Sequence, residues 1–229
     1  MKQDHRHIDI FCLFVYAHDI VTDTRDKILD AAETFVLASG FGKLTMEQLA
    51  REAGLSRATI YLHFKNKSEI ALECADRLHF RLLAHLRQIA GLSGSVVGRL
   101  RNVLIGRVLF AVDAAKQQSS GADRMLAAIR PAYMTHREQY FANEAKVVFQ
   151  LLQEGVRRGE FSVSDPDLTA FALILSTNSL MPFSLSTRQL KARYQIELRV
   201  SKIVDLVLSG LCAGPSKTKK THKSAHGRT

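Results

Sequence analysis

LTMEQLAREAGLSRATIYLHFKNK, residues 44–67, is the stretch that decides the fold of this chain. Thr45 followed three residues later by Gln48 is a capping-box pattern, which predicts that a helix begins just after Thr45. Gly54 stands where a left-handed residue commonly ends a helix, because glycine adopts that conformation without steric cost. We therefore expect a first short helix between Thr45 and Gly54.

A second short helix is predicted immediately afterwards. Ser56 is suited to cap it, and Arg57 to His63 supply its body, with Ile60 and Phe64 facing inward. Two short helices joined by a tight turn that contains glycine make a helix-turn-helix, here over residues 45–64. The second helix of this motif enters the major groove of DNA.

Polar and basic side chains occupy the outward positions of that second helix and the residues after it. Arginine pairs with guanine edges, a threonine methyl group contacts thymine, and hydroxyl and ammonium groups bind phosphates. The expected DNA-binding residues are Thr45, Ser56, Arg57, Ala58, Thr59, Tyr61, His63, Lys65 and Lys67. The alternative is a plain helical hairpin with a solvated polar face.

Residues on both sides of the hairpin add specificity to this interpretation. Those that precede it are Arg25, Ile28, Leu29, Ala31, Ala32, Phe35, Gly40, Phe41 and Thr45, and those within or just after it include Gly54, Ser56, Thr59, Tyr61, Phe64, Lys65 and Lys67. Together they resemble the N-terminal domain of the TetR family of bacterial transcriptional regulators over about residues 22–82. Ala58 and Met46 depart from the commonest family pattern, which has Gly or Pro and a β-branched residue there.

The remaining sequence predicts more helices, so the expected fold is all-α with about nine helices. An N-terminal extension, residues 1–21, is left open as strand, helix or disordered segment. The DNA-binding domain spans 22–82, a larger C-terminal domain spans 83–212, and a basic disordered tail spans 213–229.

Several helix boundaries in the C-terminal domain are predicted from local signals. Pro131 is expected to end or kink one helix, and Thr135 with Glu138 to cap the next, which runs to Arg158. The pair Asp165-Pro166 predicts the start of a helix that reaches about Leu180. That helix is apolar nearly all round and so is expected to be buried on every side. A last helix is expected over about residues 188–211.

Charge and cysteine content narrow the class of protein. The chain of 229 residues has a formal net charge of +10, and residues 43–67 alone hold five basic against two acidic side chains. Local positive charge of this kind favours contact with phosphates. The three cysteines, Cys12, Cys74 and Cys212, have no paired spacing, which favours a reducing cytoplasm over a disulfide or zinc framework.

No sequence motif indicates an enzyme: paired carboxylates, nucleophile motifs, phosphate-binding glycine loops and metal-ligand clusters are all missing. We expect no catalytic residues, no metal and no cofactor.

The family resemblance implies a ligand site and a dimer interface in the C-terminal domain. By position, the expected effector-binding residues are Arg107, Phe110, Met125, Tyr133, Phe149, Asn178 and Met181. The expected dimer-interface residues are Phe171, Leu175, Val200, Ile203, Val204 and Val207. The implied function is a homodimeric repressor that a small, largely apolar or aromatic effector releases from a palindromic operator. The alternative is an effector-independent structural or nucleoid-associated DNA-binding protein, or an activator.

Overall fold

The computed structural model describes the backbone of residues 10–117 and 122–212, and the side chains of residues 23–116, 133–134 and 136–212. Its α-helices are α1 (Ile10–Ser39), α2 (Met46–Glu52), α3 (Arg57–His63), α4 (Lys67–Ala90), α5 (Val96–Gln117), α6 (Ala122–Arg157), α7 (Pro166–Ser176), α8 (Thr187–Lys191) and α9 (Arg193–Ser209). Three 3-10 turns complete it: η1 (Phe41–Lys43), η2 (Asn178–Leu180) and η3 (Pro182–Ser184). Within the described ranges the rest of the backbone is irregular, apart from one isolated β-bridge between Phe161 and Cys212. The all-α prediction is confirmed.

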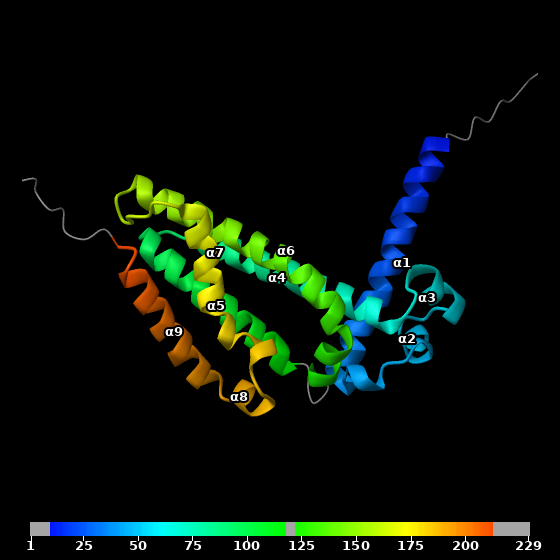
Figure 1. Cartoon of the computed structure of the whole chain (residues 1–229). Coiled ribbons are helices and arrows are strands. Elements are labelled where there is room, and N and C mark those ends of the chain that lie inside the picture. The colour runs from blue at the N-terminus through cyan, green and yellow to red at the C-terminus, as the bar shows by residue number, and fades with distance from the viewer. Residues whose placement is uncertain (1–9, 118–121, 213–229) are drawn as a thin grey trace, which may run out of the picture.

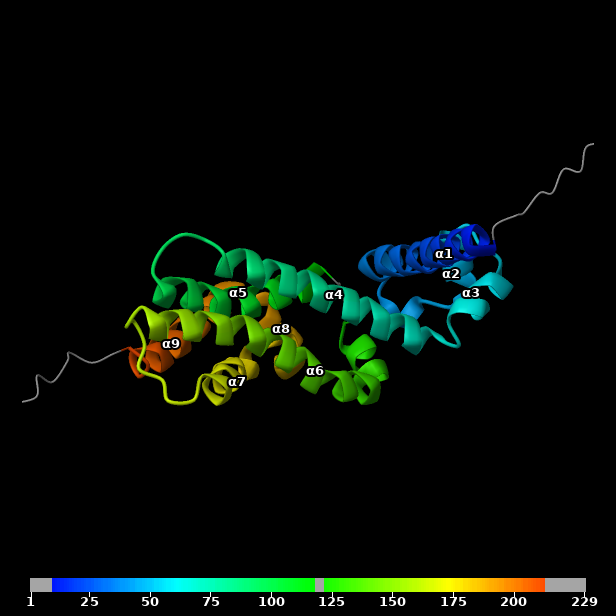
Figure 2. The ribbon, with the colours of Figure 1, turned by 90° about the horizontal axis from the view of Figure 1, so that it is seen from above.

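The molecule is elongated, with a small head of α1–α3 at one end and a body of α5–α9 at the other (Figures 1 and 2). Each part has its own hydrophobic cluster. Helix α4 belongs to both, since Ile70 and Ala71 are buried in the head cluster while Leu82 and Leu86 are buried in the body cluster. A movement of α4 therefore acts on both parts at once.

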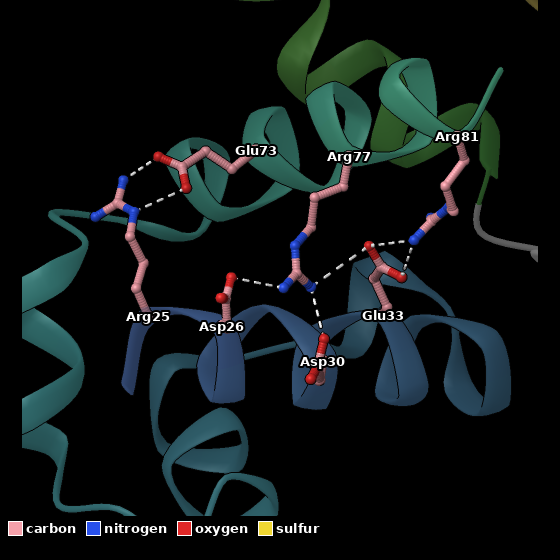
Figure 3. A network of polar contacts seen from close by, with 7 residues as sticks. All are labelled: Arg25, Asp26, Asp30, Glu33, Glu73, Arg77 and Arg81. Carbon is pink, nitrogen blue, oxygen red and sulfur yellow. Dashed lines mark hydrogen bonds and ion pairs between the residues drawn. The ribbon is translucent and has the colours of Figure 1, made fainter. Parts of the chain in front are cut away.

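A surface ion-pair network holds α1 against α4 (Figure 3). Its members are Arg25, Asp26, Asp30 and Glu33 of α1 and Glu73, Arg77 and Arg81 of α4. Arg77 lies 2.8 Å from Asp26 and 2.7 Å from Asp30, and Arg81 lies 3.0 Å from Glu33. Because the three α4 residues are four positions apart, they lie on one face of that helix.

The body contains a buried ion pair between Arg107 of α5 and Glu144 of α6. Arg107 also donates to Thr177 Oγ1 at 3.0 Å and to the carbonyl oxygen of Ile174 at 3.3 Å. His79 of α4 lies 3.5 Å from Glu144. Four helices thus meet at one polar centre inside the body.

Of the alternatives left open for the N-terminal extension, the helix is present from Ile10, where α1 begins. Several other helix boundaries differ from the sequence-based expectation. Pro131 does not end a helix and Thr135 does not begin one, because both lie within α6. The apolar helix α7 stops at Ser176 rather than near Leu180, and two 3-10 turns follow.

The last predicted helix is in fact two, because Ala192 leaves the helical conformation between α8 and α9 (φ −91°, ψ 54°). No helix in the described part of the chain is both long and apolar enough to cross a membrane.

Candidate nucleic-acid interface

Local hydrogen bonds set the start of each helix in the helix-turn-helix, as the sequence predicts. The Thr45 hydroxyl accepts from the Gln48 amide at 3.1 Å, and the Gln48 side-chain oxygen accepts from the Thr45 amide at 3.0 Å. The Ser56 hydroxyl accepts from the Thr59 amide at 3.0 Å. Gly54, with φ +65°, makes the turn between the two helices. A side chain at this φ would strain the backbone.

Helix α3 presents one continuous solvent-exposed face. Arg57, Ala58 and Tyr61 are exposed on it, and Lys65 is exposed just beyond its end. Thr59 and His63 are half-buried, and Ile60 is fully buried in the head cluster. The exposed set combines a guanidinium, an aromatic hydroxyl and an ammonium group, which are suited to base edges and phosphates.

Leu62 belongs to the same exposed face and was missed at the sequence level. Its side chain is 84% exposed, the largest fraction among the exposed large hydrophobic residues. An apolar side chain here is suited to a thymine methyl group. The sequence could have indicated the exposure of Leu62, because Leu62 lies four residues after Ala58 and therefore on the same face of the helix.

Lys67 does not extend into solvent as a phosphate ligand. Its ammonium group donates to the Leu44 carbonyl oxygen at 3.4 Å and lies 5.1 Å from the centre of the Phe41 ring. Lys67 therefore ties the start of α4 to the segment that precedes α2.

Arg25 fixes the other end of the recognition helix. Its guanidinium donates to the carbonyl oxygen of His63 at 2.9 Å, pairs with Glu73 and lies 4.3 Å from the centre of the Phe64 ring. One arginine of α1 thereby joins the end of α3 to α4, so the position of the recognition helix depends on the α1–α4 contact.

The expected effector residues that the structure describes have several different surroundings. Arg107 is held by Glu144, and Met181 is buried in the body cluster. Asn178 begins η2, and its Oδ1 atom is buried without a hydrogen-bond partner among the described residues. Phe110 lines a cavity of about 670 Å³ between head and body.

The remaining expected effector residues are Tyr133, Phe149 and Met125. Tyr133 packs against the head cluster, Phe149 packs against the body cluster, and the side chain of Met125 is outside the described residues.

The expected dimer-interface residues divide between the two helices. Phe171 and Leu175 of α7 are 37% and 44% exposed and remain available to a partner. On α9 the prediction is wrong for Val200 and Val204, which are fully buried in the body cluster.

Ile203 and Val207 pack against the same cluster, so this face of α9 serves the core of its own chain. The exposed apolar residues of α9 are instead Tyr194, Leu198 and Leu206. The apolar helix α7 is likewise not buried on every side, because Leu168 is 67% exposed.

Burial raises the pKa of the Cys74 thiol to about 12, because the charged thiolate is disfavoured away from water. That thiol is consequently poorly suited to redox chemistry. Among the described residues no cluster of His, Cys, Asp and Glu is arranged to hold a metal ion.

The structure has a helix-turn-helix head that one long helix, α4, joins to a larger helical body. This architecture is typical of helix-turn-helix transcriptional regulators. Residues 28–74 match the family described as bacterial regulatory proteins, tetR family. This match covers the helix-turn-helix and its flanking helices, so residues 28–74 resemble the DNA-binding domain of that family. The family members it resembles are regulators and not enzymes.

Two curated relatives illustrate where the sequence likeness lies. The regulator TtgR of Pseudomonas putida is 39% identical over 57 residues, which are 25% of this chain and 27% of TtgR. The regulator AlkX of Mycobacterium tuberculosis is 36% identical over 92 residues, which are 40% of this chain and 43% of AlkX. This chain thus matches less than half the length of these relatives.

Solved structures show the same fold over most of the chain. A TetR-family regulator from Pectobacterium atrosepticum is 16% identical with a TM-score of 0.64, covering 86% of this chain and 98% of that one. SmeT, the repressor of the Stenotrophomonas maltophilia multidrug efflux pump SmeDEF, is 21% identical with a TM-score of 0.57, covering 82% and 90%. At these identities the likeness concerns the fold alone.

Proposed function

We propose that this protein is a homodimeric, sequence-specific DNA-binding transcriptional regulator that acts as a repressor in the bacterial cytoplasm. A small, largely apolar or aromatic effector releases it from a palindromic operator. The observation that carries the proposal is the exposed face of α3, where Arg57, Tyr61 and Leu62 project from a helix capped by Ser56. Such a helix fits the major groove and offers contacts to bases and phosphates.

The proposed dimer uses the outward faces of α7 and α9. Leu168, Phe171 and Leu175 form an exposed apolar stripe on α7 at spacings of three and four residues. Exposed apolar stripes of this kind indicate an interaction surface, because they lower the free energy when a partner removes them from water. A two-fold dimer presents two recognition helices to the two halves of a palindrome.

The proposed repression rests on two global states of the dimer. Helix α4 is shared by both hydrophobic clusters, so an effector bound to the body can alter the separation of the two heads. In one of these states the separation of the two heads does not match the operator. A ligand that binds this state more tightly shifts the population toward it, and the operator is released.

A footprint of the purified protein on DNA upstream of its own gene, at two salt concentrations, tests this function. We expect a protected pseudo-palindrome whose affinity falls steeply with salt, because phosphate contacts release counterions. Smooth binding without a protected site would favour the structural, nucleoid-associated alternative.

Substitutions on α3 test the recognition surface. We expect Tyr61→Ala to abolish operator protection, and Leu62→Ala to weaken binding by about 1 kcal/mol, roughly fivefold. Both variants should retain the helical circular-dichroism spectrum and the dimeric mass. The matched control is Leu92→Ala, because Leu92 is an exposed leucine in the turn between α4 and α5. Unchanged operator affinity in Tyr61→Ala would place the recognition surface elsewhere.

Leu175→Glu tests the dimer. A carboxylate on the α7 stripe would have to be buried unpaired in the interface, so we expect a monomer in light scattering at micromolar concentration. Ala84→Glu, on the exposed face of α4, should leave the mass unchanged. A Leu175→Glu variant that stays dimeric would rule out this interface.

A further inference from the structure

The cavity of about 670 Å³ lies where the head meets the body. Its walls come from α1, η1, α4 and α5, with Arg193 of α9 at one side. The head contributes Val36, Phe41 and Leu44, and α5 contributes Leu109 and Phe110. A volume within about 300–1,000 Å³ suits a small organic ligand.

The charged residues that line this cavity compensate each other. Arg81 pairs with Glu33 at 3.0 Å, and Arg193 pairs with Asp113 at 2.7 Å. A charged ligand would have to disrupt one of these pairs to find a partner. An uncharged ligand leaves both pairs in place.

An aromatic and a hydrogen-bonding group meet on one wall. The rings of His85 and Phe110 are stacked, with their centroids 5.3 Å apart. His85 reaches this wall because α4 packs closely on α5 at Gly106. A Cβ atom at Gly106 would lie only 2.8 Å from Ile89 Cδ1 and 3.6 Å from His85 Nε2. An aromatic ligand can extend this stack, and a donor or acceptor on it can bond to a nitrogen of His85.

The cavity also touches the segment that leads into the helix-turn-helix. Phe41 and Leu44 line it, and the next residue, Thr45, caps α2. The Leu44 carbonyl oxygen and the Phe41 ring are the two groups that hold Lys67 at the start of α4. A molecule in the cavity would therefore press directly on the contacts that join α2 to α4.

We propose that this head–body cavity binds an uncharged, mainly apolar aromatic molecule with one hydrogen-bonding group directed at His85, and that its binding lowers the affinity for DNA. The effect on DNA rests on the function proposed above, whereas binding to the cavity does not.

Two fluorescent probes with the same rings test the site. N-phenyl-1-naphthylamine is uncharged and carries one N–H group, and 8-anilino-1-naphthalenesulfonate adds a sulfonate. We expect the uncharged probe to bind saturably, one per chain, and at least ten times more tightly than the sulfonate. Equal or tighter binding of the sulfonate, or no saturable binding of the uncharged probe, would overturn the proposal.

Variants locate the probe. Ala114 lines the cavity, so Ala114→Trp should fill it and weaken binding of the uncharged probe at least tenfold. Ala84→Trp, an equal change on the exposed face of α4, should leave binding unchanged. His85→Leu keeps the side-chain bulk but removes the hydrogen bond, and should weaken binding threefold or more even if Ala114→Trp does not fold. Unweakened binding in folded Ala114→Trp or in His85→Leu would overturn the assignment.

The effect on DNA is measured separately, on the footprinted operator. Saturating uncharged probe should weaken operator binding by the wild type at least fivefold and leave the Ala114→Trp variant unaffected. If the probe binds the cavity but operator affinity does not change, the coupling to DNA is wrong. If the wild type protects no operator without probe, the proposed function fails while the binding result stands.

Discussion

Two sets of arginine–carboxylate contacts in this protein use the same chemistry in opposite surroundings. In the surface network between α1 and α4, the side chain of Arg77 is 24% exposed and that of its partner Asp30 is 71% exposed. In the body, the side chains of Arg107 and Glu144 are 0% and 3% exposed. Water screens the first set and is excluded from the second.

The two sets consequently have different roles. Exposed pairs each contribute little, about 0–1 kcal/mol, so the loss of any one of them weakens the α1–α4 contact only slightly. The buried pair cannot lose one member without leaving an uncompensated charge away from water. It therefore constrains how α5, α6 and the end of α7 pack, whereas the surface network adds to a contact between α1 and α4 that the head cluster already makes.

Glu144→Leu is expected to have the largest effect. It leaves Arg107 buried without its carboxylate and should lower the free energy of unfolding by about 3–5 kcal/mol in urea denaturation. The double variant Arg107→Met with Glu144→Leu removes both charges and should recover most of that loss. A double variant as unstable as Glu144→Leu would show that packing, not charge, explains the loss.

Acid should weaken the same polar centre. Burial lowers the pKa of His79 from its ordinary value of 6.5 to about 4, so folding excludes a proton that the unfolded chain binds. Stability should then fall as pH decreases from about 6.5 to about 4, because the unfolded state takes up more protons in this window.

Melting temperatures of wild type and His79→Gln across this window measure that contribution. The variant should show a smaller decrease, since Gln does not titrate. Parallel curves would assign the acid sensitivity to other groups.

Arg77→Gln is expected to have a smaller effect, about 1 kcal/mol, because Arg77 contacts three carboxylates, Asp26, Asp30 and Glu33, at the surface. The loss should shrink when unfolding is repeated in 1 M salt, where charges are screened within about 3 Å. A loss that is unaffected by salt would indicate lost packing of the arginine stem instead.

Lys27→Gln is expected to have the smallest effect on the free energy of unfolding. Lys27 and Asp23 form a pair 2.7 Å long whose side chains are 58% and 63% exposed. We expect no change in the urea midpoint beyond a few tenths of a kcal/mol. A loss as large as that of Arg77→Gln would remove the distinction between a connected network and an isolated pair.

The sequence predicted the head in detail because its signals are local. Thr45, Gly54 and Ser56 act on amides or dihedral angles within three residues, and each has the predicted role. The contact that Lys67 makes was not predicted, because its acceptor, the Leu44 carbonyl oxygen, lies 23 positions earlier in the chain. Composition and spacing therefore predicted the exposed residues Arg57, Tyr61 and Lys65. They did not predict the exposed Leu62 or the contact of Lys67 with Leu44.

The body was predicted less well because its partners are distant in sequence. Arg107 reaches Glu144 across 37 positions and Thr177 across 70, which no helical period reveals. On α9, periodicity identified the apolar face of Val200 and Val204 but not whether its own chain or a second one covers it.

The amino-acid sequence by itself determined the all-α class, the helix-turn-helix and its caps, because capping, turn geometry and helical periodicity depend on residues a few positions apart. Tertiary structure alone decided the rest. It decided which apolar face of α9 enters the core, which arginine becomes buried, and where a cavity opens between head and body. These depend on how helices far apart in the chain pack, which is set by the free energy of the whole assembly of helices and not by any local pattern.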